Sequence, residues 1–131
     1  RARLRRWSVA RGRPALKAYR SALMAHEKTE PMRVVFLDAA NRLVGEEVMG
    51  RGTVDHAPVY PREIVRRALA LRARGFVLVH NHPSGDVMPS AEDMSMTAQI
   101  IAAARVVGLH VADHLIVGRE RVLSMKEAGL L

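Results

Sequence analysis

One stretch decides the fold, and it reads Val77-Leu78-Val79-His80-Asn81-His82-Pro83-Ser84-Gly85-Asp86-Val87-Met88-Pro89-Ser90-Ala91-Glu92-Asp93. The apolar run over residues 76–79 predicts a strand over residues 76–80, and the Pro-, Ser-, Gly- and Asp-rich residues after the second histidine predict a loop. Ser90 is a residue type that caps helix N-termini, so a helix is expected from Ser90 to Val107, ended by Gly108. The stretch therefore predicts a strand, a loop and a helix in succession.

Three side chains of this stretch can reach one point. Residues two apart on a strand face the same side, so His80 and His82 direct their imidazoles together where the strand ends. Asp93 falls in the first helical turn and reaches the same point if the loop folds back. Two imidazoles and a carboxylate, with a fourth position open, are the ligand set of a catalytic zinc site. This spacing favours ligation over two structural histidines, whereas Asp93 is equally explained as a helix-capping acid.

The spacing His-x-His, seven residues, Ser-x-x-Asp resembles the signature of the JAB/MPN/JAMM metallohydrolases. The wider string His-Asn-His-Pro-Ser-Gly, followed by Pro89-Ser90 and Asp93, is similar to the RadC branch of that superfamily. Further RadC landmarks follow the same order, namely Leu37-Asp38 with Asn41-Arg42, Gly52-Thr53, Pro61-Arg62-Glu63 and Asp113-His114. The resemblance covers residues 28–131. It implies an α/β fold with cytidine-deaminase-like α/β/α layering, and Zn²⁺ held by the two histidines and Asp93.

The resemblance also implies a general base. In the superfamily a glutamate just before the first strand takes the proton of the metal-activated water, and Glu30 stands at that place. Pro31 departs from the apolar or aromatic residue that usually follows this glutamate. Glu63 is the runner-up, and the pair Glu46-Glu47 supplies further rivals.

Two further positions have both a structural and a functional interpretation. The hydroxyl of Ser90 either stabilises a developing oxyanion, as in the enzymes that this chain resembles, or only caps the helix. Asp113-His114 lies on a strand expected beside the central one. There His114 is either a satisfied strand histidine or a hydrogen-bond partner of a zinc ligand.

The remaining residues predict an alternation of helices and strands. Helices are expected over residues 14–27 and 62–74, the second ended by Gly75. Strands are expected over residues 33–38, 43–54, 76–80, 109–117 and 122–124, with a helical turn over 125–128. This order predicts a mixed β-sheet flanked by helices, in one domain over residues 28–131.

The net charge of +8 is an N-terminal feature. Residues 1–20 contain eight basic residues and no acid, and residues 21–131 contain 13 of each sign. We interpret residues 1–27 as a basic arm plus short helix that links the domain to one further upstream. The alternative is a DNA-repair-associated module that binds nucleic acid phosphates through this arm, in keeping with the RadC name.

Composition narrows the remaining function classes. No apolar run approaches the length of a membrane span, and the arginine-rich start lacks the apolar region of a signal peptide. The chain has no cysteine, which excludes disulfides and thiolate metal sites and is compatible with the cytoplasm. The sequence therefore predicts a cytoplasmic zinc metallopeptidase that hydrolyses a peptide or isopeptide amide bond. Its partner is an unidentified protein or peptide substrate, and the intact ligand set favours catalysis over a non-catalytic scaffold.

Overall fold

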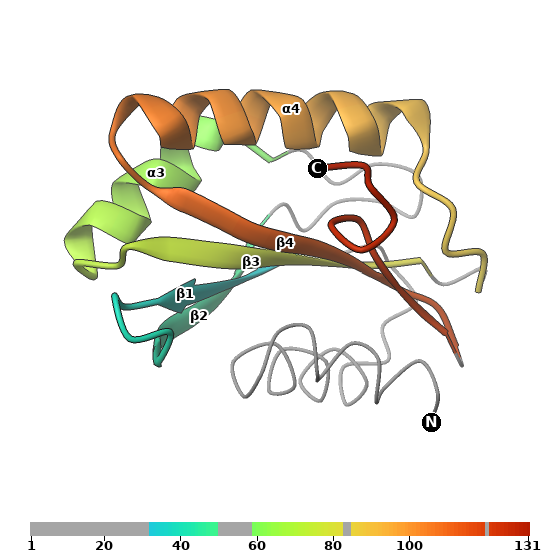
Figure 1. Ribbon diagram of the computed structural model, residues 1–131, viewed down its shortest axis with the longest axis horizontal. Coiled ribbons are helices and arrows are strands. Elements are labelled where there is room, and N and C mark those ends of the chain that lie inside the picture. The colour runs from blue at the N-terminus through green and yellow to red at the C-terminus, as the bar shows by residue number, and fades with distance from the viewer. Residues whose placement is uncertain (1–31, 50–58, 83–84, 120) are drawn as a thin grey trace.

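The described part of the chain is a five-stranded sheet with two helices (Figure 1). The computed structural model describes residues 32–49, 59–82, 85–119 and 121–131. The strands are β1 (Met32–Leu37), β2 (Leu43–Met49), β3 (Gly75–Asn81), β4 (His110–Val117) and β5 (Val122–Ser124). The helices are α3 (Pro61–Ala70) and α4 (Ala91–Val106). The order of the strands across the sheet is β2-β1-β3-β4-β5, so the strand that leads into the two histidines is central, as predicted.

The sheet is mixed, which confirms the predicted fold class. β3 and β4 run parallel, and α4 makes the crossover between them that a parallel pair requires. β1 pairs antiparallel with both β2 and β3, and β5 pairs antiparallel with β4. In the β1–β3 register Met32 lies opposite His80, so the beginning of β1 and the end of β3 lie side by side.

Both described helices pack on the same face of the sheet, where α4 lies along β3 and β4 (Figure 1). The core on this face joins residues of both helices to β1 and β3 through buried apolar side chains, among them Ile64, Ala68, Ile100, Ala104, Phe36, Phe76 and Leu78. The opposite face is buried as well, through Val35, Leu37, Val77, Val79, Leu115 and Val117. Burial on both faces explains why β3 reads as a continuous apolar run instead of an alternating one.

The end of α3 corrects one prediction. The helix was expected to continue to residue 74 and to stop at Gly75, but it ends at Ala70, and Arg72 takes the left-handed conformation with φ 57°. Gly75 instead begins β3, where an added Cβ would lie 2.5 Å from the carbonyl oxygen of His110. This glycine is therefore needed for close strand packing. At α4, Gly108 ends the helix in the left-handed conformation, as predicted.

Other expected elements are only partly described. β1, β4 and β5 match their predicted ranges to within one residue, and the expected second strand is described as far as Met49. The remainder of that strand and the helix expected over residues 14–27 lie outside the described residues. In the described ranges, neither helix combines the length and the apolar content that crossing a bilayer would require.

Candidate metal centre

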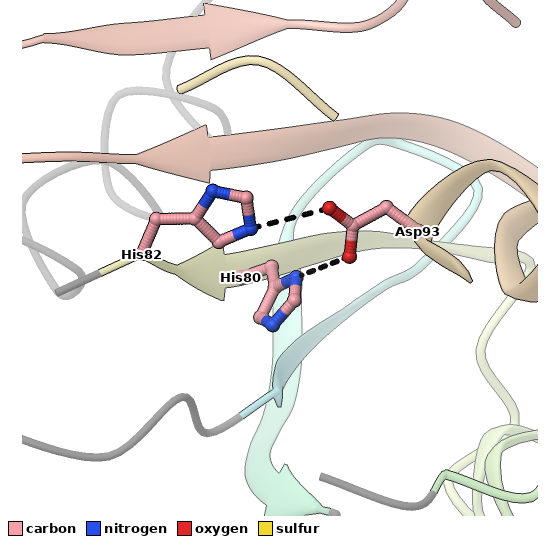
Figure 2. Close-up of side chains that lie close together, drawn as sticks. All are labelled: His80, His82 and Asp93. Carbon is pink, nitrogen blue, oxygen red and sulfur yellow. Dashed lines mark ion pairs between the residues drawn. The ribbon is translucent and has the colours of Figure 1, made fainter. Parts of the chain in front are cut away.

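The structure brings His80, His82 and Asp93 together at the end of β3 (Figure 2). Nδ1 of His80 lies 3.0 Å from Oδ1 of Asp93, and Nε2 of His82 lies 3.2 Å from Oδ2. One ligand atom from each residue falls within 4.8 Å of the others, and His80 and Asp93 are only 6% and 3% exposed. Each contact joins a nitrogen to a carboxylate oxygen, so each needs either a hydrogen on the ring nitrogen or a metal ion between the two atoms.

The backbone fixes the orientation of the His82 ring. Its Nδ1 lies 2.8 Å from the carbonyl oxygen of Asp86, and a carbonyl can only accept a hydrogen bond. Nδ1 of His82 therefore carries a hydrogen, and Nε2 is the nitrogen that faces Asp93, either as the second donor of a protonated ring or with a lone pair for a metal ion. The amide of His82 is held in turn by the carbonyl of Val117, 2.8 Å away. A ring nitrogen bonded to a backbone carbonyl, with the other one turned toward the metal, is the usual arrangement of a metal-binding histidine.

Asp93 serves the helix and the histidines with the same carboxylate. Its backbone amide donates to Oγ of Ser90 at 3.0 Å, and its Oδ2 accepts from the Ser90 amide at 2.8 Å, which completes a capping box. The predicted N-cap role of Ser90 is thereby confirmed. The two interpretations of Asp93 are not exclusive, because the capping bonds aim its carboxylate at the imidazoles.

The environment keeps the Asp93 carboxylate charged. Burial alone would raise its pKa, but the imidazoles of His80 and His82 and the amide of Ser90 outweigh burial and hold the pKa well below its ordinary range. An ionised carboxylate is the form that binds a metal ion. The donor set of two imidazole nitrogens and one carboxylate fits zinc, and it lacks the several oxygen ligands that calcium or magnesium requires.

The candidate general bases differ in what the structure says of them. Glu30 lies outside the described residues. Glu63, in the first turn of α3, binds Arg66 through a contact of 2.6 Å, and that guanidinium holds the pKa of Glu63 below its usual value. On β2, Glu46 pairs with Arg33 at 3.0 Å and Glu47 forms an ion pair with Arg67. These three described glutamates are therefore engaged by arginines.

A buried chain of hydrogen bonds reaches the site from β4. Oγ1 of Thr97 donates to the carbonyl oxygen of Asp93 at 2.7 Å and lies 2.7 Å from Nδ1 of His114. His114 thus lies beside the central strand as predicted, but it contacts the backbone of Asp93 through Thr97 and not the carboxylate directly. Sequence reasoning missed Thr97, although its spacing of four from Asp93 places both on one side of α4.

The fold and the three converging side chains define an α/β domain of the JAB class. A family model described as the RadC-like JAB domain matches residues 12–130, and the chain belongs to this family.

Two similar proteins are both named UPF0758 proteins. A UPF0758 protein of Rhodobacter capsulatus is 52% identical over 125 residues, covering 91% of this chain and 58% of that protein. A UPF0758 protein of Ruegeria pomeroyi is 49% identical over 131 residues, covering 100% of this chain and 58% of that protein. The chain therefore spans less than two thirds of the length of both relatives.

Proposed function

We propose that this chain is a zinc-dependent hydrolase of the JAMM type, in which a metal-activated water attacks a peptide or isopeptide amide bond. The observation that carries the proposal is the convergence of His80, His82 and Asp93, with ligand atoms within 4.8 Å of one another. Zinc bound there would polarise the amide carbonyl and bring the pKa of a coordinated water to about 7. The intact donor set is what favours an enzyme over a scaffold within this family.

We assign the general base to Glu30. Its carboxylate takes the proton from the attacking water and passes it to the leaving amine, a role for which proximity to the three ligands is the first requirement. Met32 lies opposite His80 in the β1–β3 register. Glu30 is two residues before Met32 in the sequence.

Glu63 is less well suited to this role. It lines a surface hollow together with Met49, which lies opposite Met32, and Met32 in turn lies opposite His80. Two strand spacings of about 4.8 Å each therefore separate the row of Met49 from His80. The carboxylate of Glu63 is also held by Arg66.

Ser90 is assigned a second role beside its N-cap. Its oxygen accepts a hydrogen bond from the amide of Asp93, and the hydroxyl keeps its own hydrogen to donate toward a developing oxyanion. Ser90→Ala should lower turnover by about 100-fold or more if this donor acts in catalysis. If the loss of turnover is no larger than the loss of folded chain in this variant, Ser90 acts only as a helix cap.

Metal analysis is the first test of the proposal. The purified chain should contain one zinc ion, and His80→Ala should abolish stoichiometric zinc while the circular dichroism of the fold is kept. A peptide and isopeptide library should be cleaved by the zinc-loaded chain and left intact after chelation. Full retention of zinc in His80→Ala would overturn the assignment of the site.

A matched pair of amides tests the general base. Glu30→Gln should keep zinc and lose turnover by about 100- to 10,000-fold, because glutamine cannot take a proton. Glu63→Gln, the same change at the rival position, should keep both zinc and turnover. The reverse result would transfer the role to Glu63.

A second candidate function rests on charge. The whole net charge of +8 is located in residues 1–20, whereas residues 21–131 are balanced. Such an arm is suited to bind the phosphates of DNA with an affinity that falls steeply with salt. Deleting residues 1–20 should abolish this binding and leave zinc content unchanged. No DNA binding by the complete chain at low salt would exclude this candidate.

A further inference from the structure

His114 is a buried histidine that the proposed chemistry does not use. Its side chain is fully buried on β4, and its ring centroid lies 6.2 Å from that of His80. Register places it opposite Leu78, on the face covered by α4. Nε2 of His114 is buried and has no hydrogen-bond partner among the residues that the structure describes. Burying a polar atom without a partner costs free energy, and a leucine or phenylalanine would fill the same place without that cost. We therefore look to the hydrogen bond of the other ring nitrogen for the reason that a histidine is present.

That other nitrogen has a defined hydrogen-bond direction. The single hydrogen of the Thr97 hydroxyl is donated to the carbonyl of Asp93, because two oxygens 2.7 Å apart need a hydrogen between them. Oγ1 of Thr97 can then only accept from the His114 ring, so Nδ1 carries the hydrogen. The hydrogen bonds therefore run from His114 to Thr97 to Asp93.

The strand holds His114 rigidly enough to act as an anchor. Its amide donates to the Asp113 carboxylate at 2.7 Å, and its carbonyl accepts from the amide of Met125 at 3.0 Å. The β3–β4 register shifts between Phe76 and Val77, just where β4 reaches Asp113. Such irregularities reorient the side chains that follow them and are frequent beside functional sites.

We infer that His114 is a positioning residue of the candidate metal centre, which acts through Thr97 to fix the first turn of α4 against β4 and thereby presents Asp93 to His80 and His82. This inference rests on the proposed function, because it concerns the same three ligands. Partners one bond removed from a metal ligand usually change metal affinity by 10- to 100-fold when they are lost.

Variants of Thr97 test the inference by removing and restoring one hydroxyl. Thr97→Val keeps the shape and should weaken Zn²⁺ binding, measured by competition with a chelator, by about 10- to 100-fold. Thr97→Ser keeps the hydroxyl and should restore the affinity to within a few-fold. At the other end of this row of hydrogen bonds, His114→Asn retains a donor near the place of Nδ1. This variant should bind Zn²⁺ better than His114→Phe. Equal affinity in Thr97→Val and the unaltered chain would overturn the inference.

A stability control separates positioning from general loosening of the fold. Ser124→Ala removes a hydrogen bond from Asp113 without touching Thr97 or His114, and it should destabilise the chain while Zn²⁺ affinity stays unchanged. With Co²⁺ as the probe, the absorption bands should shift in Thr97→Val and not in Ser124→Ala. A loss of affinity that follows stability alike in both variants would reduce His114 to a structural residue.

A readout without metal distinguishes this inference from the proposed function. If the unaltered chain binds no Zn²⁺, the proposed function fails, and the ¹⁵N spectrum of the metal-free imidazoles decides the inference. Hydrogen on Nδ1 of His114, with His80 and His82 resonances that move in Thr97→Val, supports it. Hydrogen on Nε2, or an unmoved spectrum in Thr97→Val, overturns it.

Discussion

Two buried aspartates lie on neighbouring elements, and their surroundings differ in kind. Asp113 on β4 is fully buried, and its carboxylate accepts from the amides of His114 and Lys126 and from the hydroxyl of Ser124. Asp93 on α4 accepts from one amide, that of Ser90, and otherwise faces two imidazole nitrogens.

The difference teaches how to separate a structural from a functional carboxylate. The bonds at Asp113 come from groups that always carry a hydrogen, so its oxygens are satisfied within the fold, and the carboxylate ties β5 and the C-terminal turn to β4. The imidazoles at Asp93 can release their hydrogens, which leaves a place for another cation. Burial alone would rank the two residues together, and donor type separates them.

Replacing each aspartate by asparagine should give the largest difference between the two sites, and the effect on Zn²⁺ affinity should be greatest at Asp93. Asp93→Asn should lower Zn²⁺ affinity by about 100-fold or more, since a neutral amide replaces the anionic ligand, and even a partner one bond removed from a ligand is worth about 10- to 100-fold. The amide oxygen can still accept from Ser90, so the fold should persist. Chelator competition measures the affinity. Asp93→Asn with unchanged affinity would remove the functional half of the comparison.

The structural half predicts a loss of stability without a loss of metal. Asp113→Asn should lower the free energy of unfolding by about 2 kcal/mol, because one charged acceptor of several hydrogen bonds becomes neutral. Zn²⁺ affinity of the folded chain should be retained within a few-fold. Denaturant unfolding in the presence of a chelator measures the free energy of unfolding. A metal loss as large as that of Asp93→Asn would mean that Asp113 also belongs to the site.

His114 connects the two aspartates, and its buried ring should make the free energy of unfolding depend on pH. Burial, followed by the charge of His80, lowers the pKa of His114 to about 3. The unfolded chain, with a pKa of about 6.5, binds a proton that the folded chain excludes. Stability should therefore fall as pH falls from about 6.5 toward 3, with up to about 1.4 kcal/mol per pH unit from this group. In metal-free chain, His114→Asn should show a shallower slope; an equal slope would place the proton uptake elsewhere.

A matched pair of serines gives the smallest effect. Ser90→Ala removes the N-cap beside Asp93, and Ser124→Ala removes the hydroxyl donor to Asp113. Each should cost about 1 kcal/mol of stability in thermal unfolding of the metal-free chain. A negligible cost at Ser124 would show that the two backbone amides suffice for the Asp113 carboxylate.

The sequence was most informative where one physical pattern had one solution. The apolar run into His80 required a strand buried on both faces, and Ser90 with Asp93 required a helix start, so the central βα unit was predictable. Gly75 misled because glycine has two uses: it ends helices, and it allows strands to approach closely. Only the distance to the carbonyl of His110 distinguishes them.

Within the site, the sequence predicted the contacts that depend on local spacing. His80, His82 and Asp93 are related by strand and helix geometry, whereas the contact between Thr97 and His114 joins residues 17 apart through the crossover. Such a contact depends on the register of β3 against β4, which no local pattern encodes. The roles of Glu30 and Ser90 in catalysis stay predictions.

The shortness of the segment that supplies the three ligands has a consequence for metal-dependent stability. His80, His82 and Asp93 span residues 80–93, so the entropy of closing the loop between them is small even in an unfolded chain. An unfolded chain should consequently keep some affinity for zinc, and binding to that state subtracts from the stabilisation expected by mass action. We expect zinc to protect this chain against heat by less than its affinity for the folded protein alone would give.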